Sequence, residues 1–527
     1  MALILSKATF SPNEDITGTT DGAGTLVISK LATEYLSISI DGNFNLGLFP
    51  PGSYAISHVA DNGVIESTAL EVLANPFTRV RYGFISEFSA EVDTAQYTQW
   101  SRRLHLSAIQ FYDWAWKHEF LVSHEENYGD PLGAQISRAK IKELLGEYEK
   151  AGTLAVGYVA VYAVNSDGWE RWQKSGLFNG DGEPYKLGEN FLWIVDPADK
   201  DWLPHLTRQL KHAYEFGFRA FHLDQYGWPK IAYKHDRSIV NLAEQFPIML
   251  NQIANELPGA LLIFNNVNDF PTWSTSRARQ NAIYIEVWSP HDTYGDLADL
   301  VSKSRLNNPN LPIILSAYLN PFKEVTSSLS IDSARASLAL AFAAISSGGA
   351  SHLITGGNGR VLHDPYYVKN YLADEDTKKD LENYFNFLVS SGDLLYDESR
   401  VDITMTSSFG INGEICFDSK ALLSHDASAG TLWVRVFRGE TGLTIHFINL
   451  MDQMDTLWDS PKNLLFSTTE VSINIDSVGN SIHAQIGYSS RGSQYENLEG
   501  KRHKERFAYK VQIHGPWTIV NIPTSAK

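Results

Sequence analysis

Two carboxylates at the ends of apolar, strand-like runs are the residues of this sequence best suited to chemistry. Asp224 follows Phe221-His222-Leu223, and Glu286 follows Tyr284-Ile285. Two carboxyl groups held on either side of a glycosidic bond can cleave it with retention of configuration. One attacks the sugar, while the other donates a proton and then recovers it. The rest of the chain must bring these two side chains together.

Each carboxylate also has a structural explanation. An Asp that follows a strand often caps the next helix, and a Glu at a strand end often forms a salt bridge. The neighbouring His222, Gln225 and Trp288 favour a binding site instead, because they are hydrogen-bonding and stacking groups. We therefore predict that Asp224 and Glu286 form a catalytic pair.

The composition is that of a globular protein suited to a neutral ligand. The chain has 527 residues, of which 43% are hydrophobic, and a net charge of -18. Such an acidic surface disfavours nucleic acid and anionic membranes as partners, whereas uncharged sugars remain open. The 13 Trp, 24 Tyr and 26 Phe could pack on pyranose rings, although core packing explains most of them. The composition leaves the oligomeric state open.

The sequence lacks signals for a cofactor, a metal or a membrane. The single cysteine, Cys416, excludes an intrachain disulfide and a cysteine-rich zinc site. No phosphate-binding loop, zinc-protease motif or nucleophile elbow is found, so no cofactor or metal is expected, although a structural calcium stays open. Residues 1–7 are too short and insufficiently basic for a signal peptide, and no apolar run could span a bilayer. We expect a cytoplasmic protein, or a secreted one if a leader was trimmed.

Changes in the hydrophobic pattern divide the chain into three predicted domains. Residues 1–78 contain short strands such as Leu36–Ile40, separated by turn residues, and indicate an Ig-like β-sandwich. Residues 79–395 alternate strands with helices. Residues 396–527 return to strands of period two, such as Thr431–Phe437, which predict a C-terminal antiparallel β-sandwich.

The central region has the pattern of an α/β fold, a (β/α)8 TIM barrel. Its eight strand candidates are Arg81–Ile85, Ser107–Phe111, Leu154–Val159, Ala220–Leu223, Leu261–Phe264, Ala282–Ile285, Pro312–Ser316 and Ser351–Ile354. The helical patterns between them include Trp202–Phe216, Ile239–Glu256, Leu297–Leu306 and Asp332–Ser346. Eight such units favour a closed barrel over a doubly wound open sheet. Asp224 then follows the fourth strand and Glu286 ends the sixth, at the barrel face where active sites lie.

Other polar and aromatic residues follow the same strand ends. We predict that these residues, together with the neighbours of the carboxylates, bind substrate: Tyr112, Asp113, Trp114, Tyr158, Tyr162, His222, Gln225, Asn265, Trp288 and Tyr318. For Trp114, packing at the rim of the barrel explains the position equally well. Tyr112, Asp113 and Asn265 are the strongest of these candidates, since amides and carboxylates bind sugar hydroxyls.

Short motifs in order across residues 80–370 resemble glycoside hydrolase family 66. They are Tyr82–Phe88, Ile109–Trp114, Asp130–Gly133, Tyr158–Ala163, His222–Gln225, Phe264–Val267, Glu286–Trp288 and Ser316–Tyr318. The agreement of many motifs makes the resemblance specific. This family contains dextranases and cycloisomaltooligosaccharide glucanotransferases, and its architecture of a barrel between two β-domains matches the pattern above.

The resemblance implies a role for each carboxylate. Asp224 matches the family's nucleophile and Glu286 its acid/base, in a dextranase-like hydrolysis of α-1,6-glucosidic bonds that retains configuration. Glu286 must then begin protonated, which requires a raised pKa. The implied partner is an α-glucan or oligosaccharide substrate, and its length is left open.

Two differences from the family bear on specificity. Members often carry an acid after the His of the eighth strand, whereas His352 is followed by Leu353-Ile354-Thr355. The family's glucanotransferases carry a carbohydrate-binding module inserted in the barrel region, and no gap between strands here is long enough for one. This absence favours hydrolysis over cyclisation. A transglycosylase and a non-catalytic glucan-binding protein remain the alternatives.

Overall fold

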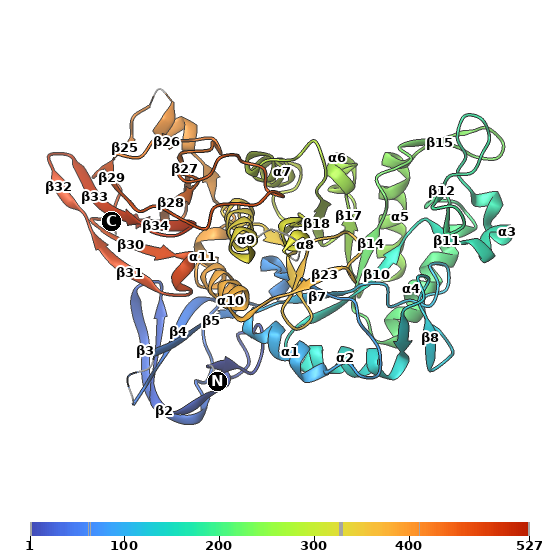
Figure 1. The fold of residues 1–527 in the computed structure, drawn as a ribbon, viewed down its shortest axis with the longest axis horizontal. Coiled ribbons are helices and arrows are strands. Elements are labelled where there is room, and N and C mark those ends of the chain that lie inside the picture. The colour runs from blue at the N-terminus through green and yellow to red at the C-terminus, as the bar shows by residue number, and fades with distance from the viewer. Residues whose placement is uncertain (1–2, 62, 64, 326–329, 411, 525–527) are drawn as a thin grey trace.

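The computed structural model describes residues 3–61, 63, 65–325, 330–410 and 412–524. The ends of the predicted domains at residues 1 and 527 lie outside them. Along the chain, an N-terminal antiparallel sheet is followed by a mainly parallel sheet with helices around it, and then by two further, mainly antiparallel sheets (Figure 1). This order is that of an α/β barrel flanked by β-rich domains.

The N-terminal region forms one five-stranded sheet. Its strands are β1 (Ile4–Leu5), β2 (Thr17–Lys30), β3 (Thr33–Asn45), β4 (Gly52–Ala60) and β5 (Ile65–Val72). The long β2 pairs with β3 along one edge and with β4 along the other. Alternate residues of β2 and β4, among them Leu26, Ile28 and Ile56, are fully buried on one face. The described residues up to Val72 contain no second sheet, so the strands predicted here are found but their sandwich arrangement is not.

The parallel sheet runs through the centre of the molecule. Its strands pair in chain order: β6 (Tyr82–Ile85), β7 (Ala108–Phe111), β10 (Leu154–Ala160), β14 (Ala220–Asp224), β17 (Leu261–Asn265), β18 (Ala282–Glu286) and β19 (Ile313–Ser316). The predicted strand Ser351–Ile354 is instead divided. β20 (Ser351–His352) pairs with β19, and β21 (Thr355–Gly356) pairs with β6. Segment 351–356 therefore brings the curled sheet round to its first strand.

Helices alternate with these strands. They include α1 (Thr94–Arg103), α2 (Arg138–Lys150), α4 (Trp202–Phe216), α5 (Leu242–Glu256), α7 (Tyr294–Asn307), α9 (Ile331–Ser346) and α10 (Glu375–Ser390), and the short α6 (Thr272–Thr275), α8 (Pro321–Glu324) and α11 (Gly392–Leu395). The predicted helix Trp202–Phe216 is found with the same bounds. The helix predicted from Ile239 begins later, because Ile239–Asn241 forms strand β16, which pairs with β15 (Ile231–Tyr233). The Asn241 side chain then caps α5 by accepting a hydrogen bond from the Ala243 amide.

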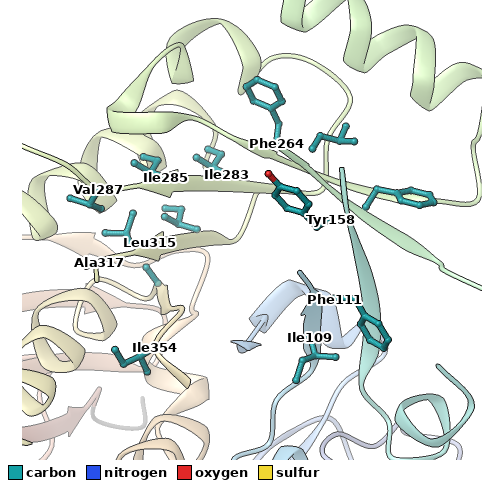
Figure 2. Close-up of a cluster of buried hydrophobic side chains, with 14 of the residues drawn as sticks. Ile109, Phe111, Tyr158, Phe264, Ile283, Ile285, Val287, Leu315, Ala317 and Ile354 are labelled. Atoms are coloured by element: carbon teal, nitrogen blue, oxygen red, sulfur yellow. The ribbon is translucent and has the colours of Figure 1, made fainter. Parts of the chain in front are cut away.

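Alternation along each strand decides which side chains face the barrel interior. In β18, Ile283 and Ile285 pack outward with Val287 in the cluster shared with the helices (Figure 2), whereas Ala282 and Tyr284 belong to the interior cluster. Glu286 shares the parity of Ala282 and Tyr284, so it too points inward. By the same alternation of side chains along the strand, Asp224 of β14 also points inward. Strand geometry alone thus directs both carboxylates to one end of the barrel interior.

The C-terminal region contains a seven-stranded and a four-stranded sheet. The first holds β24 (Val401–Asp402), β26 (Leu423–Ser424), β27 (Leu432–Gly439), β28 (Gly442–Asn449), β30 (His483–Tyr488), β31 (Tyr495–Glu499) and β34 (Trp517–Pro523). The second holds β25 (Ile415–Ser419), β29 (Thr469–Asp476), β32 (Lys501–His503) and β33 (Arg506–Ile513). Apolar residues of both sheets, such as Val434 and Ile473, form one buried cluster. The period-two pattern of these strands comes from this shared core.

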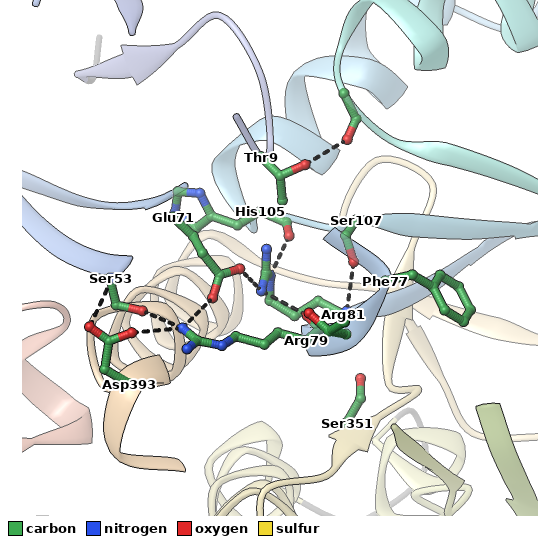
Figure 3. Close-up of polar contacts among 12 residues, drawn as sticks. Thr9, Ser53, Glu71, Phe77, Arg79, Arg81, His105, Ser107, Ser351 and Asp393 are labelled. Carbon is green, nitrogen blue, oxygen red and sulfur yellow. Dashed lines mark hydrogen bonds and ion pairs between the residues drawn. The ribbon is translucent and has the colours of Figure 1, made fainter. Parts of the chain in front are cut away.

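A buried ionic cluster joins the N-terminal sheet to the start of the barrel. Glu71 of β5 accepts hydrogen bonds from Arg81 Nη1 at 2.5 Å and from Arg79 Nη1 at 3.4 Å (Figure 3). Arg79 also contacts Asp393 of α11 at 2.9 Å, and Arg81 Nε donates to the His105 carbonyl at 2.5 Å. The cluster lies at the end of the barrel opposite to the carboxylates. Three separate parts of the chain meet there through charged side chains.

No helix within the described residues is long and apolar enough to cross a membrane.

Candidate active site

One amide joins the two predicted catalytic carboxylates. Asn265, the last residue of β17, donates from Nδ2 to Asp224 Oδ1 at 2.7 Å and to Glu286 Oε2 at 2.9 Å. β17 lies between β14 and β18 in the sheet, so its terminal side chain is placed between theirs. Because both oxygens lie within 3 Å of the same nitrogen, these two oxygens are less than about 6 Å apart, which is close enough for a pair of carboxylates to act on one glycosidic bond.

Two tyrosines bind the remaining oxygens of the pair. Tyr158 donates from Oη to Asp224 Oδ2 at 2.7 Å, and Tyr318 donates from Oη to Glu286 Oε1 at 3.0 Å. Both tyrosines are almost fully buried, whereas both carboxylates are partly exposed. Among the described residues, neither carboxylate forms an ion pair with a Lys, Arg or His. The pair is therefore held by neutral donors, and its charge is not compensated.

The surroundings raise the pKa of both carboxyl groups. For Asp224 the main cause is burial, which the hydrogen bonds from Tyr158 and Asn265 only partly offset. For Glu286 burial is again the main cause, and the negative charge of Asp224 raises its pKa further. The arrangement favours a single negative charge on the pair, with Glu286 holding the proton.

Asp113 is a third carboxyl group close to this pair. It is 9% exposed and follows β7 in a left-handed backbone conformation, with φ of 49°. Burial raises its pKa to about 8, and the charges of Asp130 and Asp224 add to the shift. These surroundings favour the protonated form of Asp113, which can donate a hydrogen bond as well as accept one.

Aromatic residues form the surroundings of these carboxyl groups. Tyr112 stacks on Tyr367 with ring centroids 4.3 Å apart and also contacts Tyr158 at 5.0 Å. Trp288 is 40% exposed and lies 5.7 Å from Tyr318. It is the one predicted aromatic with a large exposed surface, and it is placed on the side of Glu286.

Three predicted substrate-binding residues are instead turned into the protein. Trp114 is 1% exposed, and its indole donates to the Tyr158 carbonyl at 3.1 Å. Gln225 donates to the carbonyls of residues 265 and 270, while its oxygen accepts from the amide of residue 227. Tyr162 donates to the Trp228 carbonyl at 2.7 Å. These side chains are engaged with the backbone, so they position the site rather than line it, and for Trp114 the packing explanation holds.

His222 lies beneath the carboxylates rather than among them. It is 2% exposed, and its ring stacks with those of Tyr82 and Tyr158 inside the barrel. Burial lowers its pKa to about 3, so it is neutral. This follows from strand parity, because His222 comes two residues before Asp224 and occupies the layer below it.

Tyr367 is a site residue that the sequence pattern did not indicate. It lies in the loop between β22 (Arg360–Leu362) and β23 (Asn370–Leu372), where its Oη is 3.0 Å from Tyr284 Oη. Its neighbour Tyr366 lies 6.2 Å from Tyr112. The only sequence signal was a pair of tyrosines after a proline, which is common in loops.

The opposite end of the barrel contains a cavity of about 590 Å³ that holds none of these residues. Its lining includes Phe77, Leu145, Leu154 and Phe216, near the amino ends of the strands. Volume alone would suggest a ligand site there. The convergence of three carboxyl groups at the other end is the stronger sign of chemistry. Among the described residues, no group of three or more His, Cys, Asp or Glu side chains is arranged to hold a metal ion.

Curated relatives share part of the chain. Two cycloisomaltooligosaccharide glucanotransferases of Niallia circulans are each 26% identical to it, over 283 and 272 residues. These matches cover 48% and 46% of this chain but only 29% and 28% of the relatives. The chain thus aligns with less than a third of the length of the curated relatives.

Solved structures show that the fold is shared. A cycloisomaltooligosaccharide glucanotransferase of Paenibacillus sp., crystallised with cycloisomaltoheptaose, superposes with a TM-score of 0.89 over 99% of both chains at 18% identity. An alpha-amylase of Geobacillus thermoleovorans, complexed with acarbose, has a TM-score of 0.55 at 10% identity and covers 85% of this chain and 99% of its own. At these identities the likeness concerns the fold alone.

A family model decides the assignment. The model of glycosyl hydrolase family 66 matches residues 53–482, which include the whole parallel sheet and every residue of the candidate site. This match covers most of the chain and agrees with the motifs in the sequence. The chain therefore belongs to glycosyl hydrolase family 66.

Proposed function

We propose that this protein is a retaining glycoside hydrolase that cleaves α-1,6-glucosidic bonds, with Asp224 as nucleophile and Glu286 as acid/base. The observation that carries the proposal is the Asn265 amide, which contacts both carboxylates. An inverting pair needs about 6.5–9.5 Å between its carboxyl groups to admit a water molecule, whereas a retaining pair needs about 5–5.5 Å. A single bridging amide brings one oxygen of each carboxylate close together, which supports the shorter spacing.

The first step uses the unequal protonation of the pair. Glu286 gives its proton to the glycosidic oxygen while Asp224 attacks the anomeric carbon. The bond between that carbon and the oxygen breaks, and the leaving sugar departs as an alcohol. Tyr158 and Asn265 hold Asp224 in place through its two oxygens. The negative charge has then passed to Glu286, which Tyr318 and Asn265 can stabilise by hydrogen bonds.

The second step returns both carboxylates to their starting states. Glu286 takes a proton from water as the water oxygen attacks the anomeric carbon, and the bond to Asp224 breaks. Two inversions give net retention. A sugar hydroxyl in place of water would give transglycosylation by the same residues.

The substrate and the acceptor are proposed from the family and its relatives. An α-1,6-glucan is supported by the family match and by relatives that are cycloisomaltooligosaccharide glucanotransferases. Because those relatives are glucanotransferases, transglycosylation is the second candidate. We also infer that the curled parallel sheet is a (β/α)8 barrel, since segment 351–356 connects its last strand with its first.

Product analysis tests the proposal. The purified protein would be incubated with dextran and with a short isomalto-oligosaccharide, and the products separated by chromatography, with Asp224→Asn as the inactive control. We expect linear isomalto-oligosaccharides from the wild type. Cyclic or lengthened products would identify a transglycosylase. Binding without turnover would identify a glucan-binding protein and overturn the catalytic assignment.

A further inference from the structure

A segment of the C-terminal region reaches the active-site end of the barrel. Residues 450–468, named here the bridging segment, connect β28 to β29 and extend from the C-terminal sheets toward α7 and α8 (Figure 1). Trp458 is 5% exposed, and its indole donates to the His291 carbonyl at 2.6 Å. The amide of Trp458 donates to the Asp292 carbonyl, and the Tyr294 amide donates to the Thr456 carbonyl. The segment is therefore fixed to the loop that begins at Glu286.

A second set of contacts fixes the other half of the segment. Ser337 of α9 donates to the Ser460 carbonyl at 2.7 Å, and the Lys462 amide donates to the Ser333 carbonyl at 3.2 Å. The Lys462 side chain is 1% exposed and forms an ion pair with Asp455 at 2.7 Å. Because hydrogen bonds hold both of its halves, the bridging segment is a fixed part of the barrel surface.

A pocket of about 620 Å³ lies where the bridging segment meets α8. Six residues line it: Asn320, Lys323, Glu324, Asp459, Ser460 and Pro461. Asn320 and Asp459 join its two sides by a hydrogen bond of 3.3 Å. The lining contains amide, ammonium and carboxylate groups close together and no large apolar side chain, whereas the Ser460 hydroxyl is engaged with Asp455 and Lys462. Donors and acceptors of this mixture suit a neutral polyol better than an anion or an apolar ligand.

The pocket lies next to the Glu286 side of the site. Asn320 is two residues from Tyr318, so their Cα atoms are at most about 7 Å apart, and Tyr318 binds the Glu286 carboxylate at 3.0 Å. Trp288 lies beside Tyr318. In a retaining enzyme the acid/base serves the leaving group and then the incoming acceptor. The row from Glu286 through Tyr318 to Asn320 therefore leads outward along the leaving-group side.

We propose that this pocket is an outer glucosyl subsite on the leaving-group and acceptor side, built jointly by α8 and the C-terminal bridging segment. The proposal rests on the proposed function and extends it. A longer isomalto-oligosaccharide would place an outer unit in the pocket, whereas a short one would end before it. After the first step, an acceptor chain whose outer unit occupies the pocket would present the hydroxyl of its inner unit to the site; that hydroxyl gives its proton to Glu286 while its oxygen attacks the anomeric carbon and displaces Asp224.

A length-dependent kinetic experiment tests this subsite. Asn320→Ala and Lys323→Ala would be combined, and kcat/KM measured on a series of isomalto-oligosaccharides from two glucosyl units upward. We expect a loss of about tenfold on the long members and less than about twofold on the shortest. The effect should lie in KM, with kcat on short substrates unchanged. Lys211→Ala, at an exposed ion pair on the barrel surface, is the matched control.

The outcomes separate the subsite from the proposed function. Equal losses on short and long substrates, or no loss on either, would overturn the subsite while leaving the catalytic assignment intact. Should the wild type turn over none of these sugars, calorimetric binding of a long isomalto-oligosaccharide to wild type and to the Asn320/Lys323 variant decides the question. Unchanged affinity in the variant, or no binding to either protein, would overturn the proposal.

Discussion

Carboxylates lie at both ends of the barrel, in opposite electrostatic surroundings. At the amino ends of the strands, the Glu71 side chain is fully buried and contacts the guanidinium groups of Arg79 and Arg81. At the carboxyl ends, Asp224 and Glu286 accept hydrogen bonds from an amide and two phenols, and none of the described Lys, Arg or His side chains forms an ion pair with either. One end holds a compensated charge and the other an uncompensated one.

The difference assigns stability to one end and reactivity to the other. Arginines fix a carboxylate in its ionised state and in one place, so the Glu71 cluster suits the junction of three chain segments. Without a cation, full ionisation of the Asp224–Glu286 pair is disfavoured, and in the proposed mechanism the remaining proton is the one that the leaving group needs. A cation beside Glu286 would favour its ionised form and remove the acid from the first step.

Removing either reactive carboxylate should have the largest effect. We expect Asp224→Asn and Glu286→Gln each to lower kcat by about a thousandfold or more, which corresponds to about 4 kcal/mol of transition-state stabilisation. Steady-state kinetics on an isomalto-oligosaccharide measures this, with circular dichroism as the control for folding. Near-normal activity in either variant would refute its role.

Removing the Glu71 carboxylate, which pairs with arginines, should lower the stability of the fold rather than change the catalytic step directly. Glu71→Ala leaves the buried Arg81 guanidinium without its carboxylate partner, while the partly exposed Arg79 keeps Asp393, so we expect a loss of about 3–5 kcal/mol in the free energy of unfolding. Denaturant unfolding followed by fluorescence measures it. Glu256→Ala, which breaks the exposed pair with Lys211, is the control and should cost at most about 1 kcal/mol. Equal effects of the two changes would contradict the contrast drawn between the ends.

The contribution of the Asp224–Glu286 pair to the stability of the fold should depend on pH. The folded-state pKa values of Asp224 and Glu286 are raised, so their protons stabilise the fold at low pH. That contribution is complete below the unfolded pKa values of about 4 and is lost as pH rises through the folded values. We expect the Asp224→Asn, Glu286→Gln double variant to gain in melting temperature over wild type as pH rises from 4 to 8. A difference independent of pH would show that the pair is not perturbed.

The substitution with the smallest expected effect tests which of the two carboxylates is the nucleophile. Tyr158→Phe removes one hydrogen bond to the ionised form of Asp224, so the pKa of Asp224 should rise further. We expect the acid limb of the kcat/KM profile to move to higher pH, and the rate at its optimum to fall by about tenfold or less. The matched change Tyr318→Phe should instead move the basic limb, because its partner is Glu286.

Much of the fold and the core of the site followed from the sequence. Apolar runs ending in Asp224 and Glu286 predicted their places on strands, and the helix Trp202–Phe216 had strong periodicity and a terminal glycine. Gln225 and Trp114 were assigned to substrate because a sequence shows that a residue ends a strand but not whether its polar atoms are already engaged. Tyr367 was missed because its loop has no periodicity and its partners come from distant strands.

The N-terminal region and the buried ionic cluster show the same limit of prediction from sequence patterns. Period-two strands indicate a buried face but not whether a second sheet or another domain covers it. Nor could the contact between Glu71 and Arg81 be read from composition, since most such residues lie on surfaces. These arrangements depend on contacts between segments far apart in the chain, which local patterns do not encode.

The way the parallel sheet comes round to its first strand bears on how the protein is made. Gly356 of β21 lies so close to β6 that any side chain would overlap the Phe84 carbonyl oxygen, and the Tyr82 amide binds Ser351 across 269 residues of sequence. During synthesis β6 leaves the ribosome long before its partner does, and one of its edges stays unpaired for that interval. The nascent chain therefore carries an open strand edge while about half of its residues are synthesised, and an unpaired edge of this kind is a site of aggregation that a chaperone can cover.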